Sequence, residues 1–167
     1  DLGIHPVGLL SVRLFENLNH TQIQPVVFST RRSTQEDTIS YRIAAVTDWR
    51  HASRLSDESL IKEIENAQVD ILFDMSGHTA DHRLQVFAHK PAPIQISWLG
   101  YVGSTGLQAM DYVMADNVQA PPGTEQHYTE NIIRLPSTYT CFDPPDDAPE
   151  VGALPAKKRD HFTYGCL

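Results

Sequence analysis

Short apolar runs recur along the chain and are separated by segments of helical periodicity. The runs occupy residues 25–29, 69–73, 94–98 and 112–115, and a last one covers 132–135. Each run is predicted to be a strand, because it is short and is bounded by polar or turn-forming residues. Continuous apolar strands are typical of a parallel sheet that is covered on both faces, whereas half-exposed strands alternate apolar and polar residues.

The segments between these runs carry the spacing and the start signals of helices. Apolar residues recur at near-helical spacing over 6–19, where Pro6 suits the first turn, and capping residues open segments at Ser33 and Ser56. We expect the helix at Ser33 to end near Val46. Further helices are predicted at 79–89, with Thr79 as the N-cap, and near 107–109. The segment around Trp49 and Arg50 is expected to be a short connection. Alternating strands and helices predict a doubly wound α/β fold with a mostly parallel, Rossmann-like sheet.

The composition changes after residue 142. A proline-rich and charged stretch over 143–160 lacks the apolar residues that a packed element needs, so it is predicted to be an interdomain linker. Apolar residues return in 161–167, which is predicted to start a further domain with a strand that is cut off. The predicted globular unit is therefore 1–142.

Composition and charge exclude several classes of protein. A hydrophobic content of 41% is ordinary for a globular chain, and no apolar run approaches the roughly 18 residues of a membrane span. The formal charge of −8 argues against nucleic-acid binding, since Lys and Arg cluster only at 31–32 and 157–159. Cys141 and Cys166 show no metal-site or disulfide spacing, which fits a reducing compartment and predicts a cytoplasmic location.

Candidate chemistry lies where predicted strands end, because ligands of open α/β sheets gather at the carboxyl ends of the strands. One such segment is Asp74–Thr79, with a glycine and a histidine, and another is the glycine-rich segment Trp98–Gly106. A glycine-rich turn can direct backbone N–H groups at an anionic or hydroxyl-rich ligand. Taken alone, each segment also fits an ordinary turn between a strand and a helix.

A third candidate is the segment before the first predicted helix, Asp1–Pro6. His5 stands at the start of that helix, where the helix dipole favours the neutral ring. A neutral imidazole can accept a proton or donate a hydrogen bond. A histidine that only serves the backbone is the alternative.

These segments together resemble the O-GlcNAc transferase family, including its bacterial relatives. The most specific match is the run PAPIQISWLGYVGSTG over 91–106, followed by Met110-Asp111-Tyr112 and Ala115-Asp116. Supporting matches are the Asp-x-Gly-x-His-Pro pattern at 1–6, the Asp-Met-Ser-Gly-His pattern at 74–78 followed by Arg83, Glu-Gln-His-Tyr at 125–128, and Leu-Pro at 135–136. The resemblance covers nearly all of residues 1–142.

The resemblance implies the N-terminal lobe of a two-lobed GT-B glycosyltransferase. The family transfers N-acetylglucosamine from UDP-GlcNAc to Ser or Thr hydroxyls of acceptor proteins, with no cofactor and no catalytic metal. Its C-terminal lobe holds most contacts to the nucleotide sugar, and tetratricopeptide repeats accompany the catalytic region. We therefore expect three partners: an acceptor protein, a C-terminal lobe and tetratricopeptide repeats in the longer protein. We also expect this chain alone to be inactive.

The resemblance also implies roles for individual residues. His5 corresponds to a proposed base or acceptor-positioning group, and Asp1 to a group proposed in proton handling. The expected substrate-binding residues are Pro6, His78, Leu99, Gly100, Gly103, Ser104, Thr105 and Gly106.

Three residues depart from the animal relatives. His78 stands where the human enzyme has Tyr, Val102 replaces a Pro, and Ala80 replaces a Lys. The loss of Pro frees the backbone φ of the loop, and the loss of Lys removes a positive charge from the cleft.

Two other classes of function remain open at the level of sequence. A non-catalytic lobe that binds sugars or proteins is compatible with the losses at positions 80 and 102. A zinc site could use His78 and His82, four residues apart, with His89 nearby, although no four-ligand set with cysteine is apparent.

Overall fold

A computed structural model provides the structure of the chain. It describes residues 2–142, 144–145, 147–159, 161 and 163–165. Asp1 and Cys166, which the sequence singled out, lie outside the described residues.

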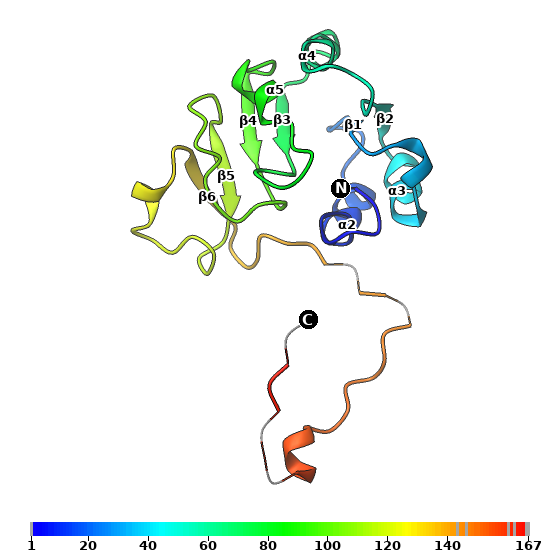
Figure 1. The fold of residues 1–167 in the computed structure, drawn as a ribbon, viewed down its shortest axis with the longest axis vertical. Helices are drawn as coiled ribbons and strands as arrows, with labels where there is room; N and C mark the ends of the chain where they lie inside the picture. Colours follow the sequence, from blue (N-terminus) through cyan, green and yellow to red (C-terminus); the bar gives the residue numbers. More distant parts are fainter. Residues whose placement is uncertain (1, 143, 146, 160, 162, 166–167) are drawn as a thin grey trace.

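The described strands form two sheets in which every pairing is parallel (Figure 1). The first sheet pairs β1 with β2, and the second has the order β3-β4-β5-β6. The strands are β1 (Val26–Ser29), β2 (Asp48–His51), β3 (Ile71–Asp74), β4 (Ile94–Ser97), β5 (Tyr112–Ala115) and β6 (Asn131–Arg134). The parallel α/β prediction is confirmed, and all carboxyl ends within one sheet lie at the same edge.

Short helices connect the strands. The α-helices are α1 (Pro6–Leu9), α2 (Val12–Asn17), α3 (Thr38–Ala44), α4 (Asp57–Asn66) and α5 (Leu84–Ala88). The 3-10 helices are η1 (Ser33–Gln35), η2 (Glu125–His127) and η3 (Pro155–Lys158). The predicted cap of α4 is confirmed, because the Ser56 side chain accepts a hydrogen bond from the N–H of Ser59.

Several predicted helices differ from those in the structure. The helix over 6–19 is interrupted at Ser11, whose hydroxyl donates to the carbonyl of Val7 and whose backbone is not helical. The helix predicted from Ser33 begins only after Asp37, which caps α3, and the helix predicted over 79–89 is reduced to α5. Thr79 caps no helix, since its hydroxyl donates to the carbonyl of Ser76.

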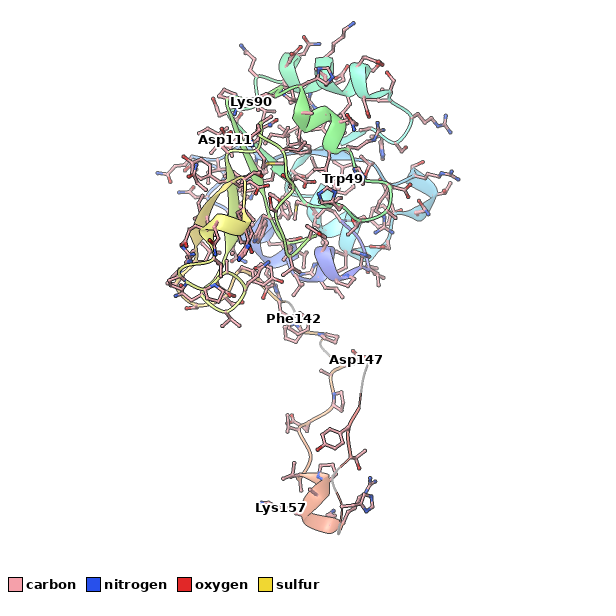
Figure 2. The ribbon with its side chains drawn as sticks, turned by 60° about the vertical axis from the view of Figure 1, so that its left-hand side comes forward. Trp49, Lys90, Asp111, Phe142, Asp147 and Lys157 are labelled. Atoms are coloured by element: carbon pink, nitrogen blue, oxygen red, sulfur yellow. The ribbon has the colours of Figure 1, made fainter. Side chains whose placement is uncertain are left out.

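The predicted helix near 107–109 does not form. The carbonyl of Ala109 accepts hydrogen bonds from the buried side chain of Gln95 and from Lys90, and it is therefore fixed by tertiary contacts. Lys90 also pairs with Asp111 at 2.5 Å, and Figure 2 shows these two side chains together at the edge of the sheet where β4 and β5 begin. At that edge, these polar groups bond one another.

Three apolar clusters form the core. One packs α2 and α3 against β1, and a second packs α4 and α5 against β3. The third joins Val7 of α1 to Trp98 and Leu99, directly after β4. The segment that carries His5 is thereby anchored against the start of the glycine-rich loop.

The chain leaves the α/β body after Phe142 (Figures 1 and 2). The described residues beyond this point are almost all exposed, and η3 is the regular element among them. Residues 161 and 163–165 do not form the predicted strand, and 162, 166 and 167 lie outside the described residues. The proposed linker over 143–160 and the lobe starting at 161 stay predictions. No helix in the described part of the chain is long and apolar enough to cross a membrane.

Candidate functional site

Two loops at the carboxyl edge of the second sheet interlock through glycines. A Cβ atom on Gly100, after β4, would lie 2.0 Å from the backbone oxygen of Met75, after β3. Gly77 has a φ of +55°, and a Cβ atom there would lie 2.2 Å from the Cβ of Tyr101. Side chains at either position would force the loops apart, so the glycines allow the two predicted segments to meet.

His78 is held against the glycine-rich loop. Its Nε2 lies 2.9 Å from the carbonyl oxygen of Thr105, and its ring meets those of Tyr101 and His82 edge-on, at centroid distances of 5.2 and 6.1 Å. A carbonyl only accepts, so Nε2 carries the proton that it donates. Nδ1 has no hydrogen-bond partner among the described residues. His78 thus offers a ligand one ring nitrogen.

The glycine-rich loop is anchored by Glu130, which the sequence did not identify. Its buried carboxylate accepts from the N–H of Thr105 at 2.7 Å, from the Ser104 hydroxyl at 2.8 Å and from the Thr105 hydroxyl. Burial raises the pKa of Glu130, but the hydrogen bonds from Thr105 and Ser104 outweigh it and lower the pKa below its ordinary value. Glu130 therefore stays ionised at neutral pH.

The anchor turns part of the predicted binding surface inward. The hydroxyls of Ser104 and Thr105 are directed at Glu130, and the side chain of Leu99 is buried beside Trp98. Leu99 has a φ of +76° and Gly106 one of +73°, so the loop is strained at a non-glycine position. What this loop offers to a ligand is mainly backbone.

Replacing Glu130 with Gln is expected to lower the free energy of unfolding by about 2 kcal/mol at pH 7, because charge-assisted hydrogen bonds to a buried loop are weakened. The pKa of Glu130 is depressed in the folded chain, so its contribution is fully present above the unfolded pKa and is lost as the pH falls through the folded pKa. Urea unfolding at several pH values should show the two proteins converging in acid. Glu150→Gln, at an exposed position, is the control.

His5 forms the N-cap of α1 and is largely exposed. Its Nδ1 accepts from the N–H of Val7 at 3.3 Å, which leaves the proton of the neutral ring on Nε2. Burial is the main cause that lowers the pKa of His5, and the positive charge of Arg31 adds to it. The ring is therefore neutral at pH 7, as the sequence predicted, with an N–H available to a ligand. Pro6 follows as the first residue of α1 and is also exposed.

The backbone around His5 is fixed by a second carboxylate that the sequence did not identify. Asp37, the N-cap of α3, accepts from the N–H of Ile4 at 2.7 Å and pairs with Arg31 at 3.2 Å. Burial raises the pKa of Asp37, but these hydrogen bonds and the charge of Arg31 bring it below its ordinary value. A Cβ atom on Gly3 would lie 1.5 Å from the guanidinium of Arg31 and 2.6 Å from the Asp37 carboxylate, so a larger residue there would displace this ion pair.

Asp74 stabilises the turn that carries His78. Its carboxylate is buried at the end of β3 and accepts from the N–H groups of Ser76 and Gly77. Burial raises the pKa of Asp74, against the opposing effect of these bonds and of the nearby histidines. Since each of its carboxylate oxygens binds an N–H of its own loop, Asp74 acts as a structural residue.

The three histidines of the zinc alternative do not form a metal site. Within the described ranges, no group of three or more His, Cys, Asp or Glu side chains is arranged to hold a metal ion. His78 instead uses Nε2 for the loop carbonyl, and the Nδ1 of His82 accepts a long hydrogen bond from the N–H of Leu84.

Comparison with known proteins identifies relatives along almost the whole chain. A family model described as glycosyl transferase family 41 matches residues 1–147. One relative is a protein of Oryza sativa subsp. japonica named probable UDP-N-acetylglucosamine–peptide N-acetylglucosaminyltransferase SPINDLY. It is 36% identical over an aligned length of 168 residues, and the alignment covers 99% of this chain. The protein of the same name from Petunia hybrida is 35% identical over 117 residues, or 70% of the chain.

A solved structure shows the same fold. A point mutant of the O-GlcNAc transferase of Thermobaculum terrenum superposes with a TM-score of 0.85 at 35% identity, over 92% of this chain. The relatives are much longer than the segment they share with it. The chain spans 29% of the solved protein, 18% of the rice protein and 13% of the petunia protein.

Proposed function

Because the chain belongs to glycosyltransferase family 41, we propose that it forms the N-terminal lobe of a nucleotide-sugar-dependent protein O-glycosyltransferase. The reaction is transfer of N-acetylglucosamine from UDP-GlcNAc to Ser or Thr hydroxyls of an acceptor protein. The family match over residues 1–147, joined to the interlocked loops at the carboxyl edge, is the observation that carries this proposal. A C-terminal lobe supplied by a longer protein would bind most of the nucleotide.

The chemistry requires in-line attack by the acceptor hydroxyl, removal of its proton and stabilisation of the departing diphosphate. This chain contributes position and hydrogen bonds, the effects that dominate such transfers. The outward N–H of His5 suits an oxygen of the acceptor or of the donor, and the Nδ1 of His78 suits a hydroxyl. Asp1 and Pro6 remain proposed participants, and no cofactor or metal is assigned a step.

The proposal extends to the surroundings of the lobe. Tetratricopeptide repeats in the longer protein would present the acceptor, and the absence of disulfide spacing in the sequence supports a cytoplasmic location. Neither inference is needed for the chemistry of the lobe.

The test compares the longer protein with the 167-residue chain in a transfer assay with labelled UDP-GlcNAc and Ser- or Thr-containing acceptor peptides. We expect the longer protein to glycosylate the acceptor and the chain alone to be inactive. Robust turnover by the chain alone would refute the division of labour between the lobes. Binding of peptide or sugar by the longer protein without any transfer would instead favour the non-catalytic module.

A further inference from the structure

An open hollow lies beside the candidate site, between the loops that follow β1 and β2. Its volume is about 380 Å³, and it is lined by Arg32, Ser33, Thr34, Ser53 and Arg54. The lining consists of two guanidinium groups and three hydroxyls, without a carboxylate or an aromatic ring. Its chemistry is that of a site for an anionic, hydrogen-bonding ligand.

No described residue neutralises the two arginines that line the hollow. Within the described residues neither Arg32 nor Arg54 forms an ion pair, although their neighbours do: Arg31 pairs with Asp37, and Arg83 with Asp57. Both side chains are exposed, and the formal charge of the whole chain is −8. Two free cations on neighbouring loops of an acidic protein form a local positive field that attracts an anion.

The hollow extends toward the candidate site. A second hollow of about 570 Å³ shares Arg32 and Ser53 with the first, contains one carboxylate, Asp81, beside Arg83, and reaches His82, whose ring lies 6.1 Å from that of His78. A ligand that occupies both hollows would therefore lie beside His82 and close to His78.

The shape and lining favour a polypeptide over a nucleotide. The first hollow has neither an aromatic nor an aliphatic side chain against which a base could stack, and its lining side chains are exposed or half-buried. Exposed arginine side chains are long enough to adjust to the carboxylates of a flexible peptide and form charge-assisted, bidentate hydrogen bonds with them. We propose that Arg32 and Arg54 bind Asp or Glu side chains of the acceptor polypeptide, close to the hydroxyl that is modified. The inference rests on the proposed transferase function.

The experiment compares the longer protein with its Arg32→Gln/Arg54→Gln double variant on two acceptor peptides. The peptides share one Ser or Thr and differ in carrying either Glu or Gln at the flanking positions. We expect kcat/KM on the acidic peptide to fall about three- to tenfold, in line with two exposed ion pairs, and to be unchanged on the neutral peptide. The preference for the acidic peptide should also weaken as salt is raised. The proposal would be overturned if the ratio of kcat/KM on the acidic peptide to kcat/KM on the neutral peptide were the same in both proteins.

Controls separate this proposal from an effect of net charge and from a diphosphate site. Lys157→Gln/Lys158→Gln removes the same charge from the exposed tail and should leave the preference intact; a loss there as well would reduce the effect to net charge. Fluorescence polarisation of the labelled acidic peptide reports binding without requiring transfer, so it tests the arginines even if the transferase proposal fails. Binding of UDP, measured without peptide, that is weakened in the arginine variant would assign the arginines to the diphosphate and contradict the peptide site.

Discussion

Replacing Gly100 with alanine is expected to lower the free energy of unfolding by about 3 kcal/mol or more. The added Cβ atom would lie 2.0 Å from the backbone oxygen of Met75 and 2.9 Å from the backbone nitrogen of Ser76. These atoms belong to the turn that Asp74 fixes with its buried carboxylate, so no flexible side-chain end can move aside. Clashes that force backbone shifts in a packed region are among the most destabilising effects of a single substitution.

The measurement is urea or thermal unfolding of the chain, with activity of the longer protein as a second readout. Gly152→Ala is the matched control, because a Cβ atom there meets no atom within 4 Å, and it should not change stability. Gly106→Ala tests backbone strain without a steric clash, because its surroundings are open but its φ is +73°. We expect it to lower the free energy of unfolding by about 1 kcal/mol. A Gly100 variant as stable as the Gly152 variant would contradict the interlocked loops.

The sequence predicted the second sheet because each of its strands coincides with a short apolar run. Strand β5 begins and ends where expected, β4 ends one residue early, and the bounds of β3 and β6 are displaced by one or two residues. Strand β2 was missed because Asp48–His51 contains a single apolar residue, Trp49, among charged and polar ones. It is held by pairing with β1 and by the guanidinium of Arg50 over the ring of Phe28, and neither contact leaves a periodic signal.

The candidate site was predictable to the extent that topology places strand ends together. His78 and the glycine-rich loop follow β3 and β4, which are neighbours in a parallel sheet, and the structure brings them into contact. Glu130 and Asp37 were missed because each bonds residues about 25 to 33 positions away in the sequence. A charged residue before a predicted strand, like Glu130, or inside a predicted helix, like Asp37, is ordinarily exposed, and only the fold reveals that its carboxylate anchors a functional loop.

His5→Ala in the longer protein is expected to lower the transfer rate about 10²- to 10³-fold, the usual loss when a preorganised hydrogen-bond donor is removed. The N-cap geometry distinguishes a donor from a base. Because Nδ1 accepts from the N–H of Val7, Nε2 carries the proton, and accepting a proton there would require the other tautomer and loss of the cap.

Conservative variants separate these roles. His5→Asn keeps an N-cap acceptor for α1 but loses reach, so the fold should remain intact while transfer stays low. His5→Gln places an amide N–H near the position of Nε2 and is expected to recover part of the activity if His5 donates, whereas a base would not be replaced by an amide. Since the pKa of His5 is lowered, the wild-type rate should be flat around neutral pH. Below the lowered pKa the imidazolium keeps its Nε2 proton, so a donor keeps its hydrogen bond, whereas a base would lose activity as the pH falls through that value. Unchanged transfer by the alanine variant would remove His5 from the mechanism and leave it as the cap of a short helix.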